Sequence, residues 1–321
     1  MSLLGHDEAW REWRGAMTSS RMHHAWILAG PRGVGKGLFA RAAAAELVAE
    51  PGVPQPPANR HPDILVPEHP PESKEEGKKL ADGQQDIRRK RSIPIDEIRA
   101  MQARLVTRPT LGSRRVVIID PADDLEKSAV NALLKSLEEP PVGTFFLLVA
   151  HRPGRILPTI RSRCRMLRFA PLSDGQVATV LAREAPQADA ATREAAVATA
   201  EGSPGAALAF VGEKLGTIHP IMRRILAEGD ERLELRGRLA EEIGGKPDRD
   251  RVSATIELAR AAVAAELRGS GRERQLALIE AHGALTRLAA QAPTYNFDPG
   301  LLVLEIGALL ARAALPREAA T

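Results

Sequence analysis

The stretch from residue 114 to residue 171 constrains the fold more than any other part of the chain. It contains two uninterrupted apolar runs, at residues 116–119 and 145–149, which are typical of strands buried on both faces of a sheet. Between them, apolar residues recur at helical spacing until a pair of prolines ends the helix. A third strand is expected at residues 166–169. Strand, helix, strand in this order predicts a right-handed crossover and a parallel sheet.

Asp120 directly follows the first of these strands. Open parallel sheets bind their ligands at the carboxyl ends of the strands. We therefore expect Asp120 to lie at the ligand-binding edge of the sheet, as the acidic residue of a nucleotide site.

A second strand and loop precede this stretch. The apolar run Ala25–Ala29 is followed by GPRGVGKG, which has the G-x-x-x-x-G-K spacing of a phosphate-binding loop. Its candidate nucleotide-binding residues are Gly30, Gly33, Gly35 and Lys36. The glycines let backbone N–H groups turn around phosphate oxygens, and the lysine adds positive charge. The alternative is a glycine turn that only joins the strand to the helix expected at residues 38–48.

Composition limits the classes of protein that need to be considered. The net charge of +4 and the pI of about 9.4 are compatible with nucleic-acid binding without requiring it, and 3% aromatic residues disfavour a base-stacking surface. A single cysteine, Cys164, excludes a disulfide framework and a cysteine-based zinc site. No His–Asp arrangement surrounds it, so we expect a packed side chain rather than a nucleophile. Without a signal pattern or a membrane-length apolar run, a soluble cytoplasmic protein is expected.

The segment from residue 67 to residue 91 is polar and highly charged. We expect a solvated, partly disordered insertion; the alternative is a basic arm that contacts nucleic-acid phosphates. A metal site at His61, Asp63 and His69 lacks a second ligand cluster, so loop residues are the favoured interpretation. Helical periodicity resumes at Ile95–Leu105.

Four motifs together resemble the clamp-loader branch of the AAA+ proteins: HPD at residues 61–63, the segment 95–99, NALLKSLEEPP at 131–141 and SRC at 162–164. The resemblance is strong over about the first 170 residues. It implies an α/β plus all-α chain, with an AAA+ P-loop parallel-sheet domain at residues 1–171. A small helical lid domain at 172–213 and a helical collar domain at 214–321 would follow, the collar joining subunits into a ring. An ordinary self-contained helical bundle is the alternative for the last part.

The chain departs from the hydrolysing members of this family at three positions. The Mg²⁺-binding hydroxyl of the phosphate loop is replaced by Gly37, and the glutamate after the strand acid is replaced by Pro121. By resemblance, the phosphate-sensing arginine of the second domain is replaced by Gly205. We therefore expect no ATPase activity of its own and no required cofactor, while weak binding of ATP or ADP without hydrolysis stays open. The family's four-cysteine zinc module is absent, so no zinc is expected.

Arg163 is retained, and the resemblance gives it a role in trans. It would project toward ATP bound by a neighbouring tau/gamma subunit and stabilise the transferring phosphoryl group. The alternative is an exposed arginine in a structural salt bridge. The implied partners are the tau/gamma and delta subunits of the bacterial DNA polymerase III clamp loader and, through the complex, the beta sliding clamp and primed DNA. No membrane partner is implied.

Two main hypotheses remain. The first is a non-hydrolysing clamp-loader subunit that donates an arginine finger during DNA replication. The second is a tau/gamma-like ATPase motor with its own ATP hydrolysis, which Gly37 and Pro121 disfavour. A weaker third hypothesis is a nucleic-acid binder that acts through residues 74–91.

Overall fold

The computed structural model describes residues 3–19, 21–84, 87–245, 247–267, 269–292 and 297–314. The chain divides into two compact units, Met1–Pro171 and Leu172–Thr321. The first unit ends where the first predicted domain ends. The predicted boundary between residues 213 and 214 stays a prediction.

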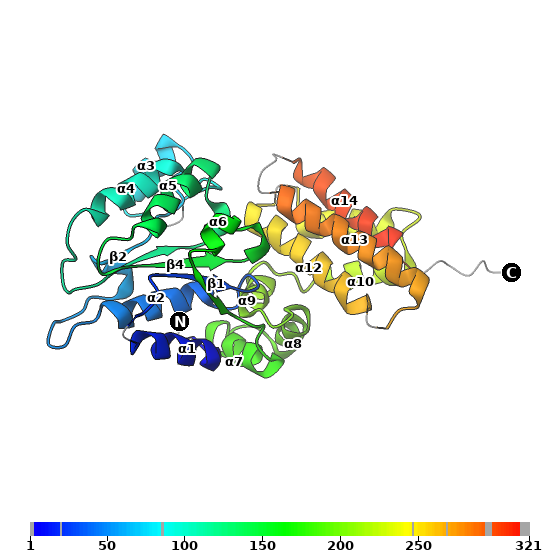
Figure 1. Cartoon of the computed structure of the whole chain (residues 1–321). Coiled ribbons are helices and arrows are strands. Elements are labelled where there is room, and N and C mark those ends of the chain that lie inside the picture. The colour runs from blue at the N-terminus through cyan, green and yellow to red at the C-terminus, as the bar shows by residue number, and fades with distance from the viewer. Residues whose placement is uncertain are drawn as a thin grey trace. The chain divides into compact units, whose positions relative to one another are not determined.

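The first unit is built on a five-stranded sheet in the order β2-β3-β4-β1-β5, in which all neighbours are parallel (Figure 1). The strands are β1 Ala25–Ala29, β2 Ile64–Leu65, β3 Arg115–Ile119, β4 Thr144–Ala150 and β5 Arg165–Arg168. Every residue of β1 and β3 is buried, as the uninterrupted apolar runs predicted. The parallel sheet expected from the sequence is confirmed.

Helices cover both faces of the sheet, so its strands need no polar face. On one face lie α4 (Ile95–Leu105) and α5 (Lys127–Glu138), and on the other lie α1 (Asp7–Met17) and α2 (Lys36–Val48) (Figure 1). Alternate strand residues such as Ile119 and Leu148 share a buried core with residues of α4 and α5, because successive side chains of a strand point to opposite faces.

The segment from residue 67 to residue 91, expected as a solvated, partly disordered insertion, contains regular structure that the sequence did not predict. It contains the helix α3 (Lys74–Ala81), which begins after Ser73 because the Ser73 hydroxyl accepts a hydrogen bond from the N–H of Glu76 at 3.2 Å. A β-bridge between Pro71 and Arg89 closes the segment. No residue of α3 is buried, so the solvated character is confirmed, while residues 85 and 86 lie outside the described residues.

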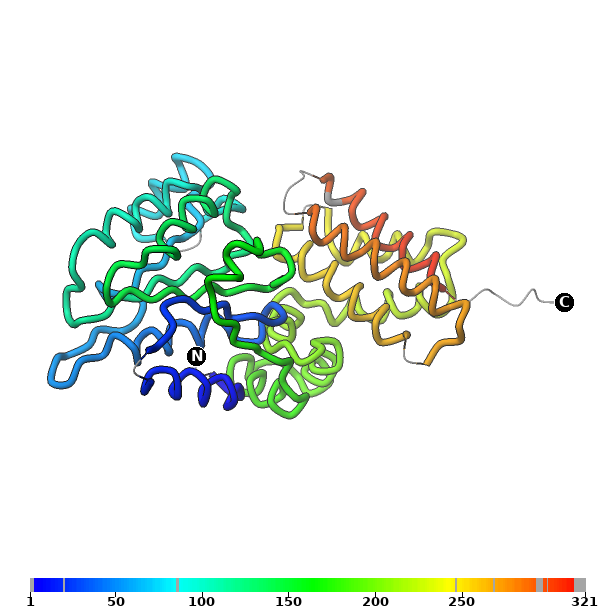
Figure 2. Tube along the Cα trace, in the orientation of Figure 1, coloured from blue at the N-terminus to red at the C-terminus, as the bar shows by residue number. Residues whose placement is uncertain are grey.

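The second unit is entirely helical within its described residues, and α12, α13 and α14 lie side by side (Figure 2). Its helices are α7 Asp174–Glu184, α8 Ala190–Thr199, α9 Pro204–Gly212, α10 Ile218–Glu228, α11 Glu234–Ile243, α12 Arg249–Leu267, α13 Arg272–Gln291 and α14 Pro299–Arg312. The helix α9 begins at Pro204, because Ser203 caps it and proline is tolerated in a first turn. Gly205 lies in that first turn.

Short helical turns connect the elements of the first unit, and its described residues include η1 Ala58–Arg60, η2 Ala122–Asp124, η3 Pro153–Arg155 and α6 Pro158–Arg161. Among the described helices, none combines the length and the apolar character needed to cross a membrane.

Candidate functional site

The candidate nucleotide site lies at the carboxyl edge of the sheet, where three neighbouring strands end. Gly30 follows β1, Asp120 follows β3 and His151 follows β4, and the N–H of Gly30 donates to the carbonyl of Ala150 at 3.3 Å. The topology therefore brings the glycine loop and Asp120 to the same edge, as the crossover pattern predicted.

The side chain of Lys36 is bound within the glycine loop to which it belongs. Gly33 and Gly35 have φ angles of 79° and 104°, which favour glycine and allow the chain to turn toward α2. Lys36 is only 2% exposed, and its ammonium group donates to the carbonyls of Gly30 at 2.7 Å and Pro31 at 2.5 Å. Burial lowers the pKa of Lys36 to about 8, against the opposing pull of nearby acidic side chains. The cation is thus held by backbone carbonyl groups of the loop.

Gly37 makes room for the carboxylate of Asp120. A Cβ atom on Gly37 would lie 2.3 Å from Oδ2 of Asp120, closer than any real contact. The same oxygen lies 3.4 Å from Nη1 of Arg41, which also donates to the carbonyl of Gly37 at 3.2 Å. The Asp120 carboxylate, paired with Arg41, therefore takes the space that a side chain on residue 37 would need.

This arrangement does not fit Mg²⁺. Oδ2 of Asp120 already lies 3.4 Å from the guanidinium of Arg41, and residue 37 offers no oxygen ligand from a side chain. Across the described part of the chain, no cluster of three or more His, Cys, Asp or Glu side chains could hold a metal ion. No metal-dependent step is assigned to this edge.

A second acidic side chain at this edge, that of Asp123, is also held by hydrogen bonds. Asp123 accepts the N–H groups of His151 at 2.6 Å and Arg152 at 2.9 Å. Burial, followed by the charge of Lys36, lowers the pKa of His151 to about 4, so its imidazole is neutral at neutral pH. Both oxygens of Asp123 are thus committed to backbone N–H groups, and Oδ2 of Asp120 lies beside Arg41.

The N-terminal residues pack on the outside of the loop. Nε2 of His6 hydrogen-bonds the carbonyl of Val34 at 2.7 Å, and Cδ1 of Leu3 lies 2.7 Å from the position of a Cβ on Gly35. The His6 ring also contacts Phe169, with 4.9 Å between the ring centroids. This cover adds to the closure of the loop by Lys36.

Arg163 lies at the other end of the sheet, in the turn between α6 and β5. One guanidinium nitrogen, Nη2, pairs with Oε1 of Glu138 at 2.7 Å, and Nη1 donates to the carbonyl of Thr159 at 2.9 Å. Its side chain is 35% exposed. Because Arg163 precedes β5 and the glycine loop follows the parallel strand β1, the strand length of about 10 Å separates it from the loop of its own chain.

Cys164 has no nucleophilic character. Its thiol is free and packs against the hydrophobic core, and burial raises the pKa of the thiol to about 12. The group is therefore protonated at neutral pH, which agrees with the predicted packing role.

Asp63, from the HPD motif, is structural. It is fully buried and accepts the N–H groups of Thr110 at 2.7 Å and Leu111 at 2.8 Å, and it lies 3.4 Å from Nη2 of Arg115. Nδ1 of His61 accepts the N–H of Asp63 at 3.0 Å. These bonds fasten the loop before β3, in agreement with the interpretation of His61 and Asp63 as loop residues.

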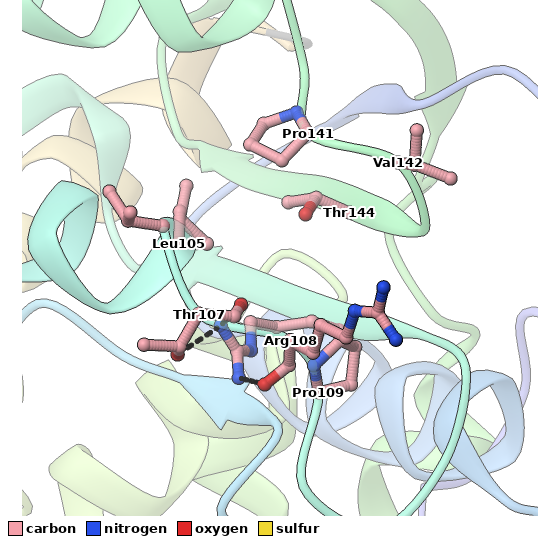
Figure 3. A pocket seen from close by; sticks show the side chains of 9 residues that line it. Leu105, Thr107, Arg108, Pro109, Pro141, Val142 and Thr144 are labelled. Carbon is pink, nitrogen blue, oxygen red and sulfur yellow. Dashed lines mark hydrogen bonds between the residues drawn. The ribbon is translucent and has the colours of Figure 1, made fainter.

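A hollow of about 200 Å³ opens near this loop (Figure 3). It lies at the amino ends of β3 and β4, because Arg115 and Thr144 are the first residues of those strands. Its labelled lining residues are Leu105, Thr107, Arg108, Pro109, Pro141, Val142 and Thr144. The hollow is therefore separate from the candidate nucleotide site, which lies at the carboxyl edge.

Sequence reasoning missed Arg41, Asp123 and His151 at the nucleotide edge and Glu138 beside Arg163. His151 and Asp123 carried a usable signal, because each follows a predicted buried strand within a few residues. Arg41 carried only the weak signal of lying one helical turn after Gly37.

Comparisons with known proteins find relatives of this chain among subunits of DNA polymerase III. A sequence model of the family described as "DNA polymerase III, delta subunit" matches residues 5–173. Two relatives are called DNA polymerase III subunit delta'. The one from Pseudomonas aeruginosa is 36% identical over 198 residues, which cover 56% of this chain and 53% of the relative. The one from Escherichia coli is 41% identical over 121 residues, which cover 38% and 36%. The chain thus spans about half or less of the length of these relatives.

A DNA polymerase III subunit gamma from Buchnera aphidicola is 30% identical over 161 residues, which cover 50% of this chain and 42% of the relative. A solved DNA polymerase III gamma subunit-related protein from Thermotoga maritima aligns over 95% of this chain and 99% of its own, with a TM-score of 0.51 and 20% identity. At that identity the likeness concerns the fold alone, and it supports the expected combination of a parallel α/β sheet with helical domains.

Proposed function

This chain belongs to the DNA polymerase III delta-subunit family, and from that premise we propose that it acts as a non-hydrolysing, delta-prime-like subunit of the clamp loader. In this role it helps to load the beta sliding clamp on primed DNA during replication. Its relatives named delta' match at higher identity than the matched gamma relative does, which favours this subunit over an ATPase subunit.

The observation that carries the proposal is the internal ion pair at the nucleotide edge. The Asp120 carboxylate faces Arg41 across the space left by Gly37, instead of facing a metal-bound water molecule. Pro121 follows where a glutamate would act as the water-polarising base, and proline has no group that accepts a proton. The subunit therefore has no hydrolysis of its own, and any binding of ATP or ADP is weak.

In this proposal the first unit keeps one residue of the ATPase machinery, Arg163, and that residue acts on another subunit. Arg163 lies at the edge opposite its own loop and is partly exposed, as a group that acts on another subunit must be. In this proposal its guanidinium reaches ATP bound by a neighbouring tau/gamma subunit and stabilises the charge that spreads over the phosphoryl oxygens.

The proposed partners follow from the same role. The chain assembles with tau/gamma and delta subunits and meets the beta clamp and primed DNA through the complex. It requires neither zinc nor another cofactor, and it works in the cytoplasm, where bacterial DNA is copied.

A tau/gamma-like motor is the second candidate, and two observations favour it: Lys36 and the glycine loop are retained, and the gamma relative matches 50% of this chain. It predicts ATP turnover by the isolated chain that is lost in Lys36→Ala. The first candidate, the non-hydrolysing subunit, predicts no ATP turnover by the isolated chain.

The direct test of the proposed function is clamp loading by a complex reconstituted from purified subunits. Loading of the beta clamp on primed DNA is measured with this chain present, with it omitted, and with a tau/gamma subunit added in its place. The proposal predicts loading only when this chain is present. Equal loading after omission would reject the proposal.

Nucleotide binding by the isolated chain should not depend on Mg²⁺, because the Arg41–Asp120 pair fills the metal position. The measurement is calorimetric titration with ATP or ADP in the presence of either Mg²⁺ or a chelator. We expect the same weak or undetectable binding under both conditions. Tight binding that appears only with Mg²⁺ would contradict the interpretation that Arg41 takes the place of the metal ion. Arg41→Gln would then be expected to leave that binding unchanged.

A further inference from the structure

Among the described residues, three acceptors hold the Arg163 guanidinium. Two are local, the carbonyl of Thr159 at 2.9 Å and the hydroxyl of Ser162 at 3.3 Å. The third is the carboxylate of Glu138, at 2.7 Å, which comes from a different element, the last residue of α5. The local contacts follow from the turn itself, so Glu138 is the one partner that can vary independently.

A carboxylate and a phosphate compete for the same donors. Both present paired oxygen atoms to the planar fork of a guanidinium, and both gain a charge-assisted hydrogen bond from it. An arginine that points its Nη2 group at Glu138 has to exchange that oxygen for a phosphate oxygen before it can act on a neighbouring nucleotide. The negative charge of Glu138 would also stay close to the incoming phosphate and repel it.

We infer that Glu138 is a positioning residue that holds the Arg163 finger on its own subunit and releases it when the neighbouring ATP site engages. The inference rests on the proposed function, because it needs Arg163 to act in trans. Glu138 then sets the fraction of assembled complexes in which the finger is engaged.

The strength of the pair suits an exchangeable contact. The side chains of Arg163 and Glu138 are 35% and 49% exposed, so water and salt screen their attraction. Exposed ion pairs of this kind are readily broken, and loss of one changes an equilibrium by up to about fivefold. A buried pair would hold the finger too firmly to be exchanged during each ATP cycle.

The neighbouring residue provides a matched control. Glu139 is also exposed and carries the same charge, but among the described residues it forms no ion pair with a cation. Glu138→Gln and Glu139→Gln therefore make the same change in net charge at adjacent positions, and only the first removes the ionic partner of Arg163.

The test is steady-state ATPase of the complete reconstituted clamp loader with clamp and primed DNA. It compares the wild type, Glu138→Gln, Glu139→Gln, Arg163→Ala and the double variant Glu138→Gln/Arg163→Ala. We expect Glu138→Gln to raise kcat by about two- to fivefold. KM for ATP should change less, because the finger acts mainly in the transition state. Glu139→Gln should match the wild type, and the double variant should match Arg163→Ala.

These outcomes separate the inference from the proposed function. If Arg163→Ala lowers turnover but Glu138→Gln does not raise it, or if the gain persists without Arg163, the role of Glu138 is overturned and the finger remains. If Arg163→Ala itself has no effect on turnover, the proposal that Arg163 acts on the neighbouring ATP site is rejected, and the role of Glu138 is rejected with it. A purely structural pair predicts the opposite sign, a lower melting temperature together with lower turnover in Glu138→Gln.

Discussion

Arg163→Ala is expected to slow ATP hydrolysis at the neighbouring tau/gamma site by about 10³-fold or more, the range for arginine fingers supplied in trans. In the proposed role the guanidinium stabilises charge on the phosphoryl oxygens, and alanine leaves that charge without a donor. The effect should appear in single-turnover hydrolysis by the assembled complex. Since the side chain is partly exposed and its contacts are confined to the surface, the variant should still assemble.

Two further variants make this prediction specific. Arg161 is exposed and forms no ion pair with a described residue, so Arg161→Ala removes an equal charge two positions away and should leave hydrolysis unchanged. Arg163→Lys keeps the charge but loses the planar paired donors, so it should recover only a small part of the rate. Full activity in Arg163→Ala would show that the neighbouring site needs no arginine from this chain.

Asp63→Asn is expected to destabilise the first unit by about 3–5 kcal/mol, the range for removing one partner of a buried ion pair. The Asp63 carboxylate accepts two backbone N–H groups, from Thr110 and Leu111, and faces the buried Arg115. An asparagine amide can accept through its oxygen only, so its NH₂ group would face a donor. Thermal unfolding should show a melting temperature lower by about 10 °C.

The same carboxylate predicts a pH dependence. Burial alone would raise the pKa of Asp63, but the N–H groups of Leu111 and Thr110 together with Arg115 outweigh it and hold the pKa below its usual 3.8. A lowered pKa means that the contribution to stability is complete above the unfolded-state pKa and is lost as pH falls through the folded-state value. The stability difference between wild type and Asp63→Asn should therefore shrink below about pH 4.

The matched control for this prediction is Asp96→Asn. Asp96 is 84% exposed and lies 3.6 Å from Arg99, so its replacement should change stability by no more than about 0.5 kcal/mol. If Asp63→Asn unfolds at the same temperature as Asp96→Asn, the buried pair does not fasten the loop before β3.

The elements of the first unit could be predicted from the sequence because their signals are local. The apolar run Ala25–Ala29 matches β1, and the helix expected at Ile95–Leu105 matches α4. A strand that is covered on both faces appears in the sequence as an uninterrupted apolar run, which is easy to recognise. Pro140 and Pro141 mark where α5 has to stop. The helix α3 was missed because its only strong signal is the Ser73 cap within a highly charged segment.

The partners of the site residues could not be predicted. The Arg41–Asp120 and Glu138–Arg163 pairs join residues far apart in the chain, and their distances depend on how α2 and α5 pack on the sheet. The sequence did indicate which groups were missing, through Gly37 and Pro121. It carried no indication of which groups fill the vacated space or hold the retained arginine.

The central claim is that this subunit has no working ATP site of its own and serves the site of a neighbour. The most direct test measures ATP turnover by the complete clamp loader with clamp and primed DNA, with either Lys36→Ala or Arg163→Ala in this chain and with matched amounts of assembled complex. We expect Lys36→Ala to leave turnover at the wild-type level and Arg163→Ala to lower it. The reverse result, turnover that depends on Lys36 and not on Arg163, would identify the chain as a motor and contradict the account.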